Sequence, residues 1–444
     1  WLPREGGELI WNRGALLRGR LEVEKLRAAH IHMLRRPEPV TGVSIPDAKA
    51  GGFELPQLPL SIDVQAVEVD NVSLDQSVLG EAADFTISAS GVLGDKGLLL
   101  RLSARTKGGN GDGLGLAADF ARADQTLTFD AEISENGGGI FARLLNMRGL
   151  PAFDLIAKGR GPLAAFSADL SLAVQGAEQI TGRFDTRTIA GDRTLSGVLS
   201  GDLSNLVNPE YAPFFGAQTV LDFDARQQAN GRIDVDRIAF QSDHARLNGR
   251  LMLNQDYWPD FIDITGEVGE QDGAAIALPG TDAGTTIEHS TLRVRYDAAK
   301  GEAFNAVAEI TGLERAEGRA ETLQLEMDGT LQGNLGSVGQ FLAQTRFAAE
   351  GIAPVDAGLA EALNGPVGGV FLLNFIEGQP LRFEDINLRG PDFTAKGKVI
   401  LGALGDGFPA RFDTTLTAAK LSRFAGLARR PLRGSAALDI TGSA

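Results

Sequence analysis

Apolar and polar residues alternate with a period of two along much of the chain. Clear examples are "LSIDVQAVEVDNVSL" (60–74), "ADFTISASGVL" (83–93), "GLLLRLSART" (97–106) and "TLTFDAEIS" (126–134), with further segments at 219–226, 231–240, 290–298 and 323–333. Because successive side chains of a strand point to opposite faces, this alternation predicts strands with one buried face and one wet face. Gly-, Asn- and Asp-rich clusters such as "SENGGG" separate the segments and supply turn residues. The pattern predicts a mainly β fold.

Four short segments have helical character instead, and they recur in one context. They are "GIFARLLNM" (139–147), "PEYAPFF" (209–215), "VDAGLAEAL" (355–363) and "LSRFAGLAR" (421–429). A Gly-marked break and an alternating strand follow each of them, so the order helix, break, strand occurs four times. Weak self-similarity of this kind is typical of an elongated array of stacked units.

A second recurrence lies in the strands themselves. The stretch "DRIAFQSDHARLNGRLML" (236–253) aligns with "EDINLRGPDFTAKGKVIL" (384–401), and a looser copy, "VDNVSL…FTISASGVL", lies near residue 70. We therefore predict an elongated, repetitive β-sheet of roughly 25 to 30 strands, curled into an open, groove-forming rod that is taco-like or solenoid-like, with a few short helices. Segments 1–150, 151–300 and 301–444 are expected to be parts of one continuous rod rather than independent domains.

Composition narrows the possible functions. Lys and Arg number 42 and Asp and Glu 58, so the net charge is 42 − 58 = −16, which opposes nonspecific attraction to nucleic acid and to anionic head groups. The absence of cysteine excludes disulfides, thiolate zinc sites and Cys nucleophiles, and it suits an extracytoplasmic protein. The first residues have no signal-peptide pattern, and no apolar stretch is long enough to span a membrane. We interpret the sequence as an internal fragment of a longer protein.

One stretch contains the residue types of a hydrolase triad. Ser242, Asp243 and His244 are consecutive, whereas a triad needs side chains that converge from separate segments. In the alignment of the two repeats they match Gly390, Pro391 and Asp392, which are ordinary turn residues. The sequence therefore favours a turn between two strands over a catalytic site.

Other candidates for chemistry have simpler explanations. His30 and His32 have the spacing of half a metal site on one strand face, but a solvated face is favoured. "GGNGDGLGL" (108–116) departs from a calcium-binding repeat and is interpreted as a turn. The acids two residues apart in "LDFDAR" and "IDVDR" alternate with apolar residues and are expected on the wet face. No metal or cofactor is expected.

The sequence resembles a known family in its cadence. The run "WNRGALLRGRLEVEKLRAAHIHMLRRP" (11–37), then "LPLSIDVQAVEVDNVSL", the helix-break-strand units and cadences such as "RGSAALDITG" are similar to the TamB branch of the AsmA-like superfamily. That resemblance implies a periplasmic protein, anchored in the inner membrane by an N-terminal helix, with an apolar groove along an incompletely closed β-structure. It also implies cooperation with an outer-membrane barrel of the TamA type and transport of phospholipid between membranes. The anchor and the barrel-binding region lie outside this sequence, so no residue here is assigned to docking.

We therefore expect a noncatalytic conduit that shields the acyl chains of phospholipid, with a possible role in outer-membrane protein assembly. The same apolar residues would form the filled core of a closed solenoid if the sheet were not open. A secreted β-solenoid adhesin and a carbohydrate-active β-helix enzyme remain alternative classes. The candidates for the groove face are the apolar positions of the alternating strands: Ile62, Val64, Phe85, Ile87, Leu127, Phe129, Leu221, Phe223, Ile238, Phe240, Leu251, Leu253, Ile386, Leu388, Val399 and Leu401.

Overall fold

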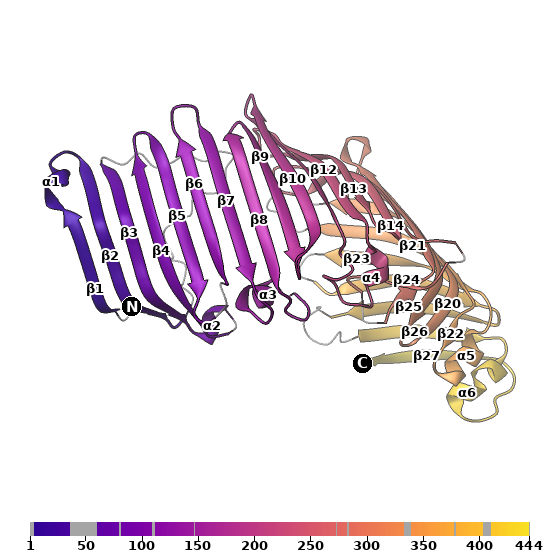
Figure 1. Ribbon diagram of the computed structural model, residues 1–444. Coiled ribbons are helices and arrows are strands. Elements are labelled where there is room, and N and C mark those ends of the chain that lie inside the picture. The colour runs from indigo at the N-terminus through magenta and orange to yellow at the C-terminus, as the bar shows by residue number, and fades with distance from the viewer. Residues whose placement is uncertain are drawn as a thin grey trace. The chain divides into compact units, whose positions relative to one another are not determined.

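The computed structural model consists mainly of strands with a few short helices (Figure 1). The chain forms two compact units. It describes residues 4–35, 60–79, 81–108, 112–145, 147–271, 273–281, 284–332, 339–376, 379–402 and 410–443. Unit 1 comprises Trp1–Asn208 and Val220–Gly231, and unit 2 comprises Pro209–Thr219 and Arg232–Ala444. The predicted segment boundaries after residues 150 and 300 fall inside these units, and the continuous rod remains a prediction.

Unit 1 is built on strands of 9 to 14 residues in the order of the chain. Its strands are β1 (Arg4–Asn12), β2 (Arg20–Met33), β3 (Ser61–Leu74), β4 (Ala83–Gly94), β5 (Gly97–Thr106), β6 (Gly113–Ala121), β7 (Thr126–Glu135), β8 (Phe153–Pro162), β9 (Ala165–Val174), β10 (Ala177–Ile189), β11 (Asp192–Gly201) and β12 (Thr219–Gln227), the last of which begins one residue before the unit boundary.

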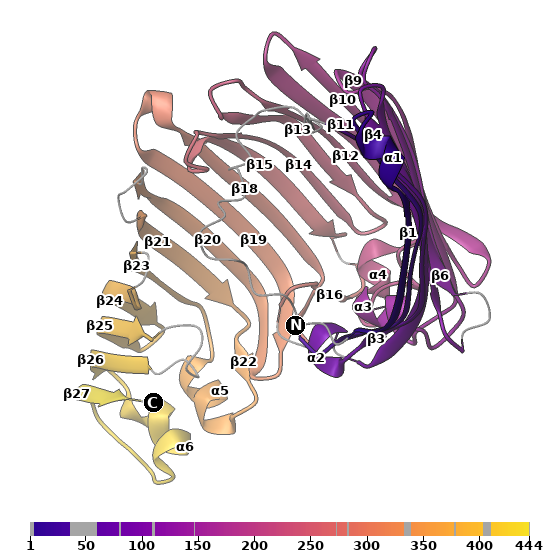
Figure 2. The same cartoon turned by 90° about the vertical axis from the view of Figure 1, so that its left-hand side faces the viewer.

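Each strand from β1 to β10 pairs with the next one along the chain. All these pairs are antiparallel except β2 with β3, which is parallel. Among the described residues β1 pairs with β2 alone, so one side of this strand has no ladder partner. Figure 2 shows the strands of unit 1 nearly edge-on, as one bowed sheet.

Unit 2 continues with strands of the same kind. They are β13 (Ile233–Gln241), β14 (Ala245–Leu253), β15 (Pro259–Gly269), β16 (Ile276–Ala277), β17 (Thr286–Ile287), β18 (His289–Asp297), β19 (Ala303–Arg315), β20 (Gly318–Gln332), β21 (Gln340–Glu350), β22 (Ala353–Pro354), β23 (Val367–Ile376), β24 (Leu381–Gly390), β25 (Phe393–Leu401), β26 (Ala410–Ala418) and β27 (Ala436–Ser443).

The long strands of unit 2 also form an antiparallel meander. Two short insertions in the chain leave the order of the long strands intact. The β16–β17 pair follows β15 in sequence, but β15 pairs directly with β18; β22 follows β21, but β21 pairs directly with β23. A parallel β-helix would instead pair successive coils in parallel. The long, sequential antiparallel ladders therefore differ from a wound solenoid.

The helices are few and short, as predicted. They are α1 (Arg13–Leu16), α2 (Gln76–Leu79), α3 (Ile140–Leu144), α4 (Ala212–Phe215), α5 (Ala357–Leu363) and α6 (Ala425–Ala428), with 3-10 turns η1 (Ala298–Lys300) and η2 (Leu421–Phe424). The four predicted helical segments correspond to α3, α4, α5 and η2 with α6, and all four are confirmed. The eight strands predicted from alternation correspond to β3, β4, β5, β7, β12, β13, β18 and β20.

Most of these short segments occur at a regular interval along the chain. Four long strands separate α2 from α3, α3 from α4, α4 from the β16–β17 pair, that pair from α5, and α5 from α6. We call these six segments caps. After an even number of antiparallel strands the chain is back at the same end of the strands, so successive caps of one unit lie at the same strand ends. The predicted recurrence of helix, break and strand therefore corresponds to one cap after every four long strands.

The buried core is thin for a chain of this length. Among the described residues, Phe153 and Ile287 are the only large side chains less than 2 % exposed. Phe153 packs with Ala142 of α3 and Val174, and a second cluster in unit 1 joins Val72 and Phe85 to α3. The chain is 66 % strand and 9 % helix, and its sheet is open. The predicted class, mainly β with an open sheet and few short helices, is confirmed.

Candidate functional site

The register of unit 1 places apolar residues on one face of its sheet. Ile87 pairs with Ala104, Ala104 with Leu114, and the row continues across β4 to β11 without a charged side chain. Its members are Ile87, Ala104, Leu114, Ile133, Leu155, Leu172, Ile180 and Gly201. The adjacent row on the other face is Ser88, Ser103, Gly115, Glu132, Ile156, Ser171, Thr181 and Ser200. We call the first face the unit-1 apolar face.

Unit 2 has an equivalent apolar face. One row of cross-strand partners extends from β13 to β27: Val235, Leu251, Ile262, Tyr296, Phe304, Gly329, Ala343, Leu373, Phe383, Val399, Phe412 and Gly442. Neither charged nor amide side chains interrupt it. Phe304 and Phe341 stack on this face at a centroid distance of 4.8 Å, and burial raises the pKa of the Tyr296 hydroxyl.

The structure places all sixteen groove candidates on these two faces. The eight in unit 1 share a face with the row described above. On that face the ring centroids of Phe223 and Phe184 lie 6.4 Å apart. The eight in unit 2 lie on its apolar face. Only Phe85 among the sixteen is buried, and the other fifteen are partly exposed. The described residues form a single sheet layer, and of the sixteen side chains Phe85 and Phe240 also pack against aromatic rings of caps.

The opposite faces carry the charges. Arg346 binds Glu326 and Asp328 of the neighbouring strand at 3.3 and 3.0 Å, which raises the pKa of the arginine. In unit 1 a hydrogen bond from Ser167, and more weakly Arg183, lower the pKa of the Asp185 carboxyl. A hollow on the unit-2 polar face is lined by cations and acids together, among them Arg246, Glu267, Arg293 and Glu309. These cross-strand charges keep the polar faces in contact with water.

The three residues of the triad candidate, Ser242, Asp243 and His244, hold a cap in place. They connect β13 to β14, so the predicted turn is confirmed. The Ser242 hydroxyl donates to the Phe214 carbonyl at 2.6 Å, His244 Nδ1 donates to the Pro213 carbonyl at 2.8 Å, and the Asp243 carboxylate accepts from a backbone N–H of residue 217 at 3.1 Å. Each side chain thus bonds to the backbone around α4 rather than to another member of a triad.

The turn that aligns with it in the second repeat does the same. Asp392 accepts from Arg423 of η2 at 2.9 Å, and Phe393 contacts Phe424 edge-on. The repeats also agree in backbone geometry, because both have a β-bulge immediately before the aligned isoleucine, Ile238 or Ile386. The predicted equivalence of residues 236–253 and 384–401 is therefore visible in the strand register. The looser copy near residue 70 has a bulge before Val72.

The remaining candidates are structural as well. His30 and His32 lie on the polar side of β2, where His30 contacts Asn71 at 3.0 Å. Asp112 accepts two hydrogen bonds from Asn136. Residues 109–111 of the predicted turn lie outside the described residues, and residues 113–116 begin strand β6, so the turn prediction was wrong for them. In the described part of the chain, no group of three or more His, Cys, Asp or Glu side chains is placed to hold a metal ion.

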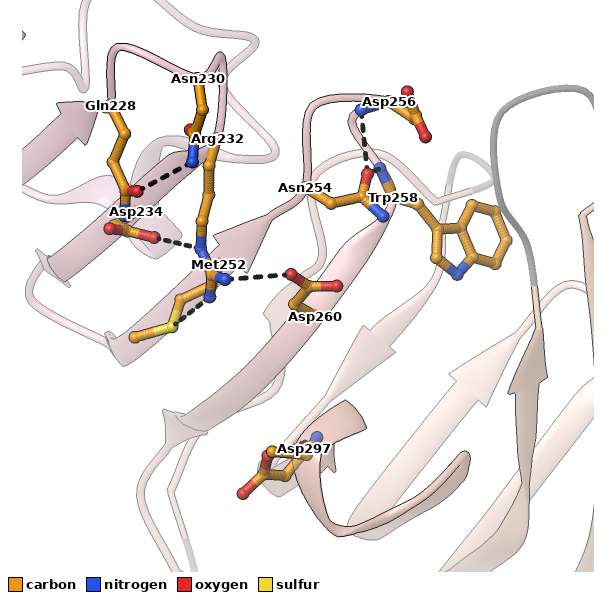
Figure 3. A network of polar contacts seen from close by, with 11 residues as sticks. Gln228, Asn230, Arg232, Asp234, Met252, Asn254, Asp256, Trp258, Asp260 and Asp297 are labelled. Carbon is orange, nitrogen blue, oxygen red and sulfur yellow. Dashed lines mark hydrogen bonds and ion pairs between the residues drawn. The ribbon is translucent and has the colours of Figure 1, made fainter.

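The acids of "IDVDR" also have structural roles. Figure 3 shows Arg232 between Asp234, 3.0 Å away, and Asp260, 3.3 Å away. Asp234 is buried, and the guanidinium also lies 3.3 Å from the sulfur of Met252. These contacts connect the ends of β13, β14 and β15 on the polar side. Asp236 falls in the bulge that precedes Ile238.

The chain was compared with models of protein families, with curated proteins and with solved structures. None of them matches. Among the described residues, no helix combines the length and the apolar character needed to cross a membrane. The likeness to the TamB branch therefore stays a prediction from sequence, and the functional argument depends on the two apolar faces.

Sequence reasoning did not identify the residues that hold the caps. Both carboxylate oxygens of Glu135 accept backbone hydrogen bonds from α3, from Phe141 at 2.7 Å and from Ala142 at 2.6 Å. Glu135 is 4 % exposed and occupies an inward position of β7, which the alternation assigns to apolar residues. A charged residue at an apolar position, just before a helical segment, was the signal that could have revealed it.

Proposed function

We propose that this protein is a noncatalytic component of envelope biogenesis whose apolar faces shield the acyl chains of phospholipid during passage between two membranes. The observation that carries the proposal is the uninterrupted row of apolar side chains across consecutive strands, most of them partly exposed to solvent. Soluble monomers rarely leave so large an apolar surface uncovered unless it binds something.

The energetics favour an extended apolar ligand. Each methylene transferred from water to an apolar surface contributes about 0.8 kcal/mol, so an acyl chain gains several kcal/mol even from partial contact. Movement along the sheet requires that no position holds the chain much more tightly than the next. The row from Val235 to Gly442 consists of aliphatic, aromatic and glycine positions about 4.8 Å apart, which supports such uniformity.

The cellular setting of the proposal comes from the sequence resemblance. It comprises a periplasmic location, an inner-membrane anchor and a barrel of the TamA type as partner, and no described residue is assigned to any of them. A protein that moves lipid in this way needs no cofactor.

Photocrosslinking tests whether lipid occupies the apolar face. A photoreactive amino acid at Leu388, which is partly exposed and lies between Gly369 and Ala395, should yield a phospholipid adduct by mass spectrometry after purification from a bacterial envelope. The same probe at Arg389, one residue away on the opposite face, is the matched control. Equal labelling at both positions, or no adduct at Leu388, would contradict the proposal.

A charge placed on the face tests the need for a continuous apolar surface. Phe129→Asp puts a carboxylate beside Phe166, with which Phe129 stacks at 5.8 Å, whereas Thr128→Asp puts it on the exposed polar side of the same strand. We expect the first variant to block lipid transfer between vesicles and the second to retain it. Phe240 is a less selective position, because it also packs against Phe214 and Phe215 of the α4 cap. Transfer that is unaffected by Phe129→Asp, in a protein that stays folded, would refute the role of this face.

A further inference from the structure

The last two caps of unit 2, α5 and α6, pack against each other. The helices α5 and α6 touch backbone to backbone: a Cβ atom on Gly358 would lie 2.7 Å from the Leu427 nitrogen, and one on Gly426 would lie 2.9 Å from the Gly358 Cα. No larger residue fits at this crossing without separating the helices. Figure 2 shows the two helices together beside the last strands of unit 2.

Arg423 fixes this pair to the sheet. Its guanidinium binds the Asp392 carboxylate at 2.9 Å and donates to the carbonyl of Asn364, just beyond the end of α5, at 2.7 Å. Lys420 binds the other oxygen of Asp392 at 3.2 Å. These contacts attach both helical segments to the sheet. We call residues 355–363 together with 420–433 the basic cap.

The charge of the basic cap is opposite to that of the chain. Residues 420–433 contain five cations and no acid, whereas the whole chain carries −16. The basic cap itself contains two acids, Asp356 and Glu361, and Asp392 pairs with two of its cations, so the local balance is 5 − 3 = +2. The three arginines beyond α6, namely Arg429, Arg430 and Arg433, are exposed, and their side chains make no ion pair with a described residue.

Apolar side chains project from the same cap. Val355 is 76 % exposed, Leu427 44 % and Leu359 40 %, so the basic cap exposes three large aliphatic residues as well as its three arginines. Aliphatic side chains bordered by Arg are the combination that inserts into the interfacial region of a bilayer with anionic head groups. Single-stranded nucleic acid would instead call for aromatic residues that stack on bases, and no aromatic residue of the basic cap is exposed.

We propose that the basic cap binds the surface of a bilayer that contains anionic phospholipid. The arginines contact head-group phosphates, and Leu427, Leu359 and Val355 enter the boundary between head groups and acyl chains. The inference does not rest on lipid transport, because a peripheral membrane contact of this kind would serve an adhesin or a scaffold equally well. It assigns a membrane-contacting role to the basic cap of unit 2.

Vesicle cosedimentation of the complete 444-residue chain tests the proposal. Binding is expected to vesicles of phosphatidylcholine with phosphatidylglycerol but not to phosphatidylcholine alone, and it should weaken as salt is added. Each arginine near an anionic surface strengthens binding about fivefold, so replacing Arg429, Arg430 and Arg433 together with Gln should lower the partition coefficient roughly 100-fold. Leu427→Ser should also weaken binding, since it removes an inserted side chain.

The matched control removes three exposed cations from the polar face of the same unit, Arg389, Lys396 and Arg411, by the same change to Gln. Binding that falls equally in both triple variants would reduce the effect to net charge and overturn the proposal. So would absence of binding to anionic vesicles, or cap-dependent binding to heparin without binding to vesicles. Loss of vesicle binding in the cap variant with lipid adducts still formed at Leu388 would separate this surface from the proposed function.

Discussion

Replacing Glu135 tests whether strand-end carboxylates hold the caps on the sheet. Glu135 ends β7 and accepts two backbone hydrogen bonds from the first turn of α3, while the helix covers Phe85 and Phe153 at one end of the unit-1 apolar face. Glu135→Ala removes both acceptors and leaves the helix with no charged partner at its start. We expect α3 to detach from the sheet far more often than in the parent protein.

The size of the effect follows from the two contacts. A hydrogen bond to a charged group contributes about 1.5–3 kcal/mol, and part of the total for two is offset because the variant no longer buries a carboxylate. A net loss of about 3 kcal/mol is therefore expected for the closed state of the cap. Since about 1.4 kcal/mol corresponds to a factor of ten, amide hydrogen exchange in α3 should become roughly 100-fold faster.

Hydrogen exchange measured by mass spectrometry over the peptide at residues 139–145 reads this opening directly. Glu132→Ala, an exposed position on the polar face of the same strand, is the control and should leave exchange unchanged. Exchange in Glu135→Ala that equals the parent rate would show that α3 is held by its apolar contacts alone. The carboxylate would then have no part in positioning the cap.

Three further results are expected. Arg423 and Lys420 lower the pKa of the Asp392 carboxyl. The stabilising effect of this carboxylate is therefore present above its unfolded pKa of about 3.9 and is lost as pH falls through the lower folded value. Hydrogen exchange of the α5 amides should rise only in acid, and Asp392→Asn should abolish that rise. Gly358→Val should separate α5 from α6, detected as faster proteolysis at the basic cap with the rest of unit 2 intact. Phe153→Ala should destabilise unit 1 by about 3–5 kcal/mol in denaturant unfolding, whereas substitution of the exposed Leu145 should change little.

Within each regular strand, the alternation of residue types predicted which residues share a face. A period of two divides the residues of a strand into two sets, and for positions such as Ile87, Phe129 and Val399 the structure places the apolar residue on the same face as its apolar cross-strand partners. The repeat alignment was equally informative, because the paired residues of β13 with β14 recur in β24 with β25, bulge included. Local sequence determines these features, so it also reveals them.

Long-range contacts could not be derived in the same way. Arg423 and Asp392 are 31 residues apart, and their pairing requires the position of α5 to be known first. The bulges also interrupt the period of two: in "VDRI" the apolar residues Val235 and Ile238 are three apart yet share a face, as strict alternation would not allow. Helices of four residues such as α1 and α2 are too short for any period to appear in their sequence.

The interval of four strands between caps has a consequence for how such a chain can change in length. Removing a single strand would reverse the direction of every later strand within a unit, and the following caps would move to the opposite end of the strands. Removing two strands moves no cap across the sheet, and removing four with their cap leaves a shorter copy of the same architecture. Viable insertions and deletions are therefore expected to come in whole hairpins, so that strand parity acts on this protein as a reading frame acts on a gene.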